Sequence, residues 1–123
     1  HFNMNTVSTS TMTTVLNKLG ATGLPIYVSE LDMSGDDATQ LARYKEKFPV
    51  LWNHPSVKGV TLWGYIQGQT WEPNTHLLNS NGTERPAMKW LKQFFGQSAL
   101  TEGQSIMLEK DNVETTAEPT AAQ

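Results

Sequence analysis

The sequence has no cysteine, so it can form neither a disulfide framework nor a cysteine-based metal site. It also has no apolar run long enough to span a membrane. No basic cluster of the kind that binds nucleic acid is present, and the three histidines do not have metal-ligand spacing. These absences predict a globular domain without a metal, a nucleic acid or a membrane span among its partners.

Aromatic residues are present only in the first part of the chain. Residues 1–96 contain all the aromatic side chains and nearly balanced charges, whereas residues 97–123 contain no aromatic residue and are acidic. This shift predicts a domain boundary near Gly96, with residues 97–123 as an acidic tail or linker. Within the tail, residues 105–108 have the composition of a short strand.

Helical and strand patterns alternate along the chain. The apolar spacing and cap residues predict helices over residues 10–19, from Asp36 or Asp37 to Trp52 with a kink or a new turn at Pro49, and from Pro86 to Phe95. Runs of β-forming residues predict strands over residues 25–30 and 57–66. This alternation is typical of parallel β/α architecture. A complete (β/α)₈ barrel takes about 250 residues, so the sequence predicts an incomplete part of one.

The segment LPIYVSELDMSGDD begins as a buried strand and ends on two carboxylates, Glu30 and Asp32. Because side chains alternate along a strand, Ile26, Val28, Glu30 and Asp32 are predicted to share one face. A buried carboxylate is costly without partners, which indicates a special role for this strand end.

The strand ends of a β/α barrel meet at one mouth, where reactive groups lie. Trp63 is predicted near the end of the next strand, with Trp71 in the loop that follows, and His1 at the end of a fragmentary earlier strand. A mouth with carboxylates, an imidazole and two indoles suits a sugar ring, because indole faces pack on the C–H face of a pyranose.

Three stretches resemble the C-terminal part of the family ten glycoside hydrolases, the β-1,4-xylanases: PIYVSELDM, YKEKFPVLWNHPSVKGVTLWGYIQGQTW and LLNSNGTERPAMKWL. That family has a T-E-L-D type motif after its seventh strand, matched here by residues 29–32. It has W-G on its eighth strand and a second tryptophan eight residues later, matched by Trp63, Gly64 and Trp71. His1 takes the place of the histidine that closes the sixth strand. The resemblance covers about residues 1–95 and implies an α/β fold, the C-terminal portion of a (β/α)₈ TIM barrel from the end of strand six to helix eight.

The resemblance also implies a function. The chain would be a fragment of a retaining endo-1,4-β-xylanase that acts on xylan without a cofactor, at a secreted, periplasmic or cell-surface location. Glu30 would be the nucleophile, His1 and Asp32 would support it, and Trp63 and Trp71 would wall the sugar site. The acid/base residue would come from the N-terminal part of the same barrel, in the same or a separate chain, so this chain alone is predicted to be inactive.

Two positions depart from the family pattern, and both are candidate substrate-binding residues. Glu72 stands where many relatives have arginine, and Gln67 stands where many have an acidic residue. The residues themselves leave simpler interpretations open: Asp32 as a turn cap and Trp63 as a core residue. For the whole chain, the alternatives are a non-catalytic carbohydrate-binding fragment and another β-1,4-glycanase such as a cellulase.

Overall fold

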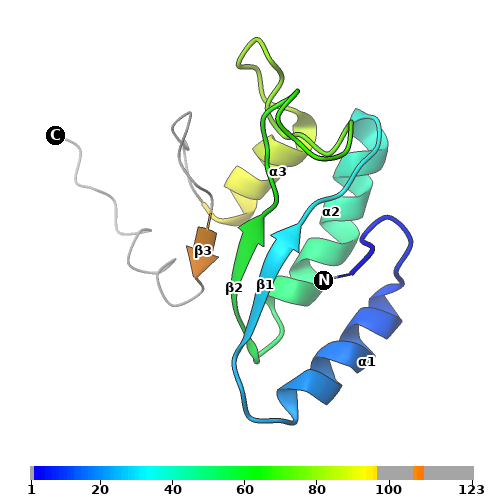
Figure 1. Cartoon of the computed structure of the whole chain (residues 1–123), viewed down its shortest axis with the longest axis vertical. Helices are drawn as coiled ribbons and strands as arrows, with labels where there is room; N and C mark the ends of the chain where they lie inside the picture. The colour runs from blue at the N-terminus through cyan, green and yellow to red at the C-terminus, as the bar shows by residue number, and fades with distance from the viewer. Residues whose placement is uncertain (1, 97–106, 110–123) are drawn as a thin grey trace, which may run out of the picture.

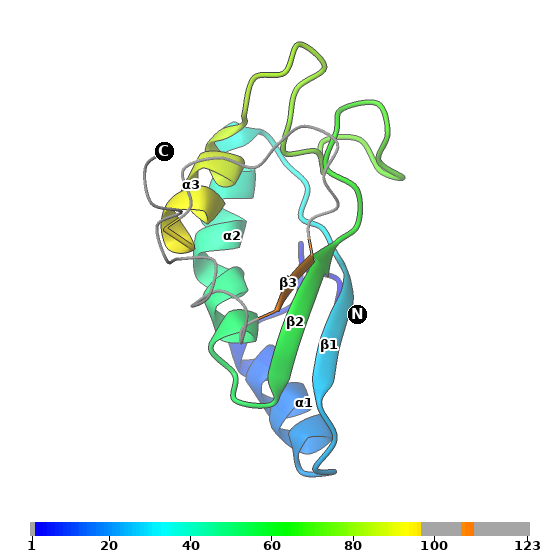
Figure 2. The same ribbon diagram turned by 90° about the vertical axis from the view of Figure 1, so that its left-hand side faces the viewer.

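The computed structural model describes residues 2–96 and 107–109. The described elements, in chain order, are α1 (Thr9–Gly20), β1 (Ile26–Leu31), α2 (Asp37–Trp52), β2 (Val57–Leu62), α3 (Pro86–Phe94) and β3 (Met107–Glu109). The helices α2 and α3 cover one face of β1 and β2, and no described helix covers the opposite face (Figures 1 and 2). This half-covered parallel sheet is the arrangement expected for part of a barrel.

The helix starts follow local signals in the sequence. Asp36 caps α2, since its Oδ1 accepts a hydrogen bond of 2.8 Å from the backbone N–H of Thr39. Pro86 occupies the first turn of α3, where its missing N–H costs nothing. Of the kink or new turn predicted at Pro49, the new turn is not present, because α2 continues as one helix to Trp52, and the kink stays a prediction. Buried packing of its last turn outweighs the one hydrogen bond that proline removes.

The core lies between the sheet and the α2–α3 layer. Phe48 is its centre: its ring stacks on Trp52 at 6.1 Å and meets Trp90, Phe94 and Phe95 edge-on at 5.6–6.2 Å. Burying an aromatic side chain of this kind stabilises the fold by roughly 1.5–3 kcal/mol. The tight aromatic cluster therefore fixes α2 against α3, and with them the loops that precede both helices.

One side of α1 and β1 remains apolar and exposed. The apolar residues whose spacing predicts the helix over residues 10–19 are Met12, Val15, Leu16 and Leu19, and they are expected to share its buried stripe. Met12 and Leu16 face the core, whereas Val15 and Leu19 are exposed. Tyr27 on β1 is also exposed. The prediction for Val15 and Leu19 is therefore wrong within the described residues, because only one side of α1 contacts the rest of them.

The register of β1 against β2 slips before β1 ends. The parallel pairs on either side of the slip are Val28 with Val60 and Leu31 with Leu62. β1 thus carries one more residue than β2 in this interval, and such a bulge re-aims the side chains that follow. Val28 and Leu31 are buried, whereas Glu30 and Asp32 are only half-buried. The predicted common face of Ile26, Val28, Glu30 and Asp32 stays a prediction, and the strict alternation behind it is interrupted at Leu31, which is buried next to half-buried Glu30.

β2 is shorter than predicted and ends at Leu62 instead of residue 66. Gly64 adopts φ = 78°, in the left-handed region that favours glycine, and this turns the chain away from the sheet. The segment that follows is not a plain loop, since Ile66 and Glu84 each form a β-bridge to Leu78. Trp63 consequently lies just beyond the strand end.

β3 pairs antiparallel with β2, so the strand order is β1-β2-β3. Met107 and Leu108 confirm part of the strand predicted for residues 105–108, and residues 105 and 106 lie outside the described part. The predicted boundary near Gly96 stays a prediction. No helix within the described ranges is long and apolar enough to cross a membrane.

Candidate functional site

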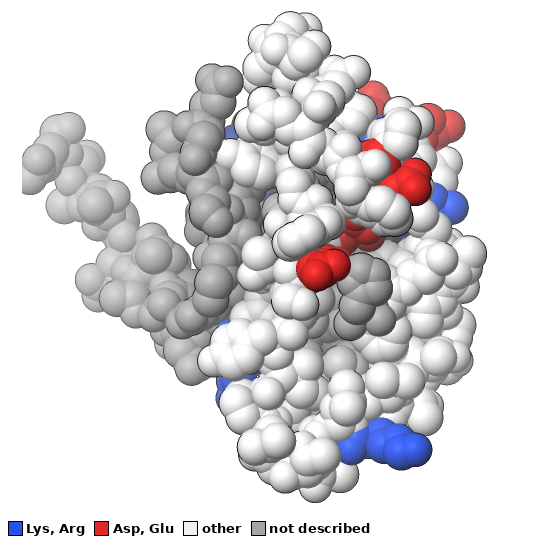
Figure 3. Space-filling model, in the orientation of Figure 1, with Lys and Arg blue, Asp and Glu red and all other residues white. Residues whose placement is uncertain are grey.

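The loops that follow β1 and β2 form one acidic region. On the face seen in Figure 3, the Asp and Glu side chains extend from the middle of the molecule to its upper right. A cleft of about 310 Å³ opens here between three loops, and its lining includes Asn3, Asp32, Trp71 and Glu72. The structure thus brings three of the predicted site residues, Asp32, Trp71 and Glu72, to one cleft.

A direct hydrogen bond joins the two strand-end loops. The indole Nε1–H of Trp71 donates to Oδ2 of Asp32. Asp32 directly follows β1, and Trp71 lies in the segment after β2, 39 residues further along the chain. The turn that begins α2 is capped by Asp36 and not by Asp32. The hydrogen bond described for Asp32 therefore orients the indole of Trp71. The interpretation of Asp32 as a turn cap did not include this role.

The two tryptophans share a second depression. Trp63 and Trp71 line an open hollow of about 580 Å³ together with Gly64, Gly68 and two polar loop residues. Their exposures are 47% and 65%, so Trp63 is not a core residue of the part of the chain that the structure describes. Trp71 lines both this hollow and the cleft of Asp32. Exposed indoles that border hollows can pack on the apolar face of a sugar ring.

Glu30 occupies the next-to-last position of β1 and is half-buried. It is two residues from Asp32, within the bulge that breaks the strand alternation. Neither the cleft nor the tryptophan hollow includes Glu30 among its described lining residues. His1 lies outside the described residues, so its support of Glu30 stays a prediction.

Gln67 and Glu72, the two departures from the family pattern, lie in different places. The Oε1 of Gln67 accepts a hydrogen bond of 2.9 Å from the backbone N–H of Ser80. Gln67 lines a third hollow of about 560 Å³, which contains Arg85 and neither tryptophan. Glu72 instead lies beside Trp71 in the cleft. The structure therefore separates Gln67 from the tryptophans and keeps Glu72 with them.

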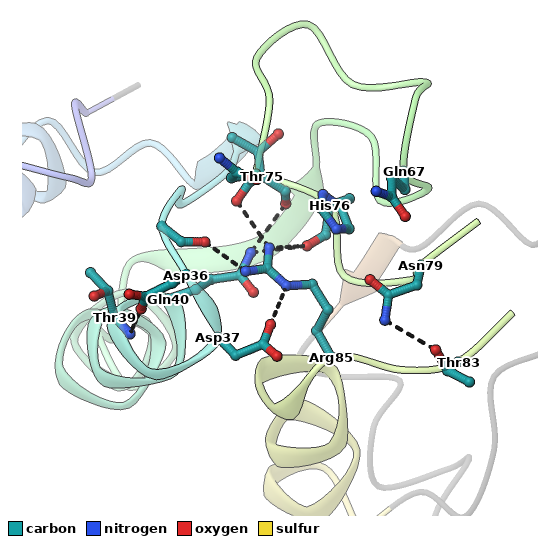
Figure 4. A network of polar contacts seen from close by, with 12 residues as sticks. Asp36, Asp37, Thr39, Gln40, Gln67, Thr75, His76, Asn79, Thr83 and Arg85 are labelled. Carbon is teal, nitrogen blue, oxygen red and sulfur yellow. Dashed lines mark hydrogen bonds and ion pairs between the residues drawn. The ribbon is translucent and has the colours of Figure 1, made fainter. Parts of the chain in front are cut away.

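A buried arginine beneath these loops was not found by sequence reasoning (Figure 4). Arg85 is 4% exposed and forms an ion pair with Asp37 at 2.8 Å. Its guanidinium also donates to three backbone carbonyls, those of Gly35 at 2.6 Å, His76 at 2.9 Å and Asn74 at 3.0 Å. In the sequence, Arg85 shows only as the residue before a helix-starting proline, which carries no signal for this role.

Gln40 and His76 complete the same network (Figure 4). The Nε2 of fully buried Gln40 lies within hydrogen-bond distance of the carbonyls of Met33 and His76, each at 3.0 Å, and of that of Thr75 at 3.3 Å, so its two N–H groups are shared among three acceptors. His76 is buried, and burial together with the positive charge of Arg85 lowers its pKa. A neutral His76 beside a charged Arg85 is therefore the favoured state at neutral pH.

The chemistry available at this site is that of carboxylates and indoles. Within the described residues, no group of three or more His, Asp or Glu side chains is placed to hold a metal ion. The strand ends offer a carboxylate on β1, a second carboxylate bound to an indole, and two exposed ring faces. A carboxylate beside indole platforms can stabilise or attack the anomeric carbon of a bound sugar.

Comparison with known proteins adds an independent finding. The sequence model of glycosyl hydrolase family 10 matches residues 1–94. Endo-1,4-beta-xylanase B of Cellvibrio japonicus is 48% identical over 80 residues, which cover 64% of this chain and 13% of that protein. Endo-1,4-beta-xylanase 1 of Arabidopsis thaliana is 36% identical over 77 residues, 60% of this chain and 8% of its own length.

A further relative has a different kind of name. Anti-sigma-I factor RsgI6 of Acetivibrio thermocellus is 28% identical over 71 residues, 56% of this chain and 9% of that protein. The aligned part of this chain thus spans about an eighth or less of the length of these relatives.

Proposed function

This chain belongs to glycosyl hydrolase family 10, and from that premise we propose that it is part of a retaining endo-1,4-β-xylanase that hydrolyses internal bonds of xylan. The observation that carries the proposal is the hydrogen bond between Asp32 and Trp71 at the strand ends, two residues after Glu30. It places a carboxylate-bearing strand end directly beside an indole that borders two hollows.

In this proposal Glu30 is the nucleophile. Its carboxylate attacks the anomeric carbon, the bond to the leaving sugar breaks, and a covalent glycosyl-enzyme forms with inverted configuration. Water then opens this intermediate, and the second inversion gives net retention. A second carboxyl group about 5–5.5 Å away must protonate the leaving oxygen and then deprotonate the water. We assign that group to the N-terminal part of the barrel.

The remaining site residues hold the sugar and the nucleophile. Trp63 and Trp71 pack on the sugar ring, and Asp32 fixes the indole of Trp71 through its hydrogen bond. His1 and Asp32 support Glu30 in its ionised state. Glu72, in the cleft beside Trp71, contacts substrate hydroxyls. Gln67, in the separate hollow of Arg85, acts at the edge of the site.

The test uses the full-length protein that contains this chain. Glu30→Ala should lower kcat on xylo-oligosaccharides with an activated leaving group by at least about 10⁴-fold. Added azide should restore turnover and give a glycosyl azide of inverted configuration, because it attacks the space that the carboxylate leaves. The matched control is Glu46→Gln, an exposed carboxylate of α2. Activity of Glu30→Ala within tenfold of wild type would exclude Glu30 as the nucleophile.

The second part of the proposal concerns the domains of this chain and the rest of the barrel. Residues 1–96 form the C-terminal part of the catalytic barrel and residues 97–123 an acidic tail or linker, at a secreted, periplasmic or cell-surface location. This chain alone should not hydrolyse xylan, and the missing N-terminal part of the barrel should restore activity. Comparing rates on xylan and on cellulose separates a xylanase from another β-1,4-glycanase.

A carbohydrate-binding role without catalysis is the second candidate. It is favoured by the two exposed indoles of Trp63 and Trp71, which border an open hollow. In that case the full-length protein would bind xylo-oligosaccharides in a calorimetric titration and release no reducing sugar from xylan. Substitution of Glu30 would then leave the binding unchanged.

A further inference from the structure

We propose that Arg85 is a positioning residue of the sugar site, which holds the loop after β1 and the segment after β2 together and so aligns Trp71 with Asp32. The proposal deepens the proposed function and rests on it. It assigns a site role to a residue that lines neither the cleft of Asp32 nor the hollow of the tryptophans.

The first step is the reach of one guanidinium. Arg85 contacts Gly35, in the loop after β1, and both Asn74 and His76, in the segment after β2. Its Nε also pairs with Asp37 in the first turn of α2. Two nitrogens of the planar group thus join the backbone of two separate segments, and the third bonds the carboxylate of Asp37. The single ammonium of lysine does not reproduce this geometry.

Gln40 forms a second clasp between the same two segments. Its single Nε2 lies within hydrogen-bond distance of Met33, after β1, and of Thr75 and His76, after β2. The carbonyl of His76 accepts from both Gln40 and Arg85, so the two clasps meet at one atom (Figure 4). We call Arg85 and Gln40 together the loop clasp.

The loop clasp lies close to the site in sequence on both sides. Met33 and Gly35 are one and three residues after Asp32, whereas Asn74 and Thr75 are three and four residues after Trp71. The hydrogen bond between Trp71 and Asp32 crosses between the same two segments. Because Trp71 is largely exposed, its own packing does not fix it, and the clasp supplies the constraint.

The loop clasp also accounts for its buried charge. Arg85 is nearly inaccessible, and a buried cation is costly unless it is paired and fully hydrogen-bonded. Asp37 supplies the countercharge, and the three carbonyls accept the remaining donors described for it. A buried arginine whose three nitrogens all donate hydrogen bonds is suited to hold loops in one arrangement, since slippage of a loop leaves a donor or the charge unpaired.

The test compares three variants of the full-length protein. Arg85→Met should lower kcat on xylo-oligosaccharides by about tenfold or more, with a smaller change in KM, because the nucleophile's surroundings lose alignment. Arg85→Lys keeps the positive charge beside Asp37 but lacks the planar guanidinium that bonds several carbonyls. Compared with Arg85→Met, it should therefore recover more of the lost free energy of unfolding than of the lost kcat. The matched control Leu91→Ala, at a buried position of α3, should destabilise the protein and leave kcat within twofold. All rates are taken well below the unfolding temperature of each variant.

A double-mutant cycle separates positioning from general destabilisation. If Arg85 acts through Trp71, then Arg85→Met should lower kcat by less than threefold in a Trp71→Phe background. Full additivity of the two changes, or equal losses of kcat in Arg85→Met and Leu91→Ala, would overturn the positioning role.

One further measurement does not depend on activity. The indole N–H resonance of Trp71, assigned by its loss in Trp71→Phe, should shift in Arg85→Met and stay in place in Leu91→Ala. An unchanged resonance in Arg85→Met overturns the loop clasp. If wild type does not hydrolyse xylan, the proposed function fails, and the resonance still tests the clasp separately.

Discussion

Replacing Trp71 by phenylalanine in the full-length protein removes the indole N–H, which forms the hydrogen bond to Asp32. Phenylalanine keeps a ring that can pack on a sugar, but it has no N–H to donate to Oδ2 of Asp32. The change therefore separates the two roles proposed for Trp71, the platform for the sugar and the tie to Asp32.

The size of the effect follows from the exposure of the pair. A hydrogen bond to a charged group is worth about 1.5–3 kcal/mol when water does not compete. Trp71 is 65% exposed, so water replaces part of the lost bond and we take about 1–1.5 kcal/mol. At about 1.4 kcal/mol for each factor of ten, kcat/KM should fall roughly five- to twelvefold.

The assay is the steady-state hydrolysis of xylo-oligosaccharides. The control is Trp90→Phe, the same truncation at a ring on α3 that packs edge-on against Phe48 at 6.2 Å. It should cost stability and leave kcat/KM within twofold, because Trp90 lines neither the cleft nor the tryptophan hollow. If Trp71→Phe matches wild type within twofold, the bond to Asp32 has no part in catalysis and the argument built on it fails.

Two predictions concern stability. Phe48→Ala removes the ring at the centre of the aromatic cluster. It should lower the free energy of unfolding, measured by denaturant titration, by about 3–5 kcal/mol. A loss below about 1 kcal/mol would contradict the packing described. The pKa of His76 is lowered by burial and by Arg85, so protonation favours the unfolded state. The stability from neutral His76 is therefore complete above about pH 6.5 and is lost as the pH falls through the lowered folded pKa. The midpoint of thermal unfolding should fall less steeply with acidification in His76→Gln than in wild type; parallel profiles would refute this.

The sequence was sufficient where the signals are local. The capping carboxylate of Asp36 and the proline at the start of α3 fix helix ends through contacts within a few residues, and the structure has both. The predicted end of β2 was wrong because the turn at Gly64 ends the strand before the β-forming residues that follow it. The bulge in β1 was missed because it exists only relative to a partner strand.

The loop clasp shows why part of the site escapes sequence reasoning. Arg85 meets Gly35 across 50 residues and Asp37 across 48, and Gln40 meets His76 across 36. No spacing rule covers contacts of this kind, since they arise only when both strands and both helices have assembled. A carboxylate at a strand end can be recognised from its neighbours in the chain, but the residue that holds an indole against that carboxylate cannot. The sequence therefore reveals candidate substrate-binding groups more readily than the buried groups that we propose align them, and variants of Arg85 test the second kind directly.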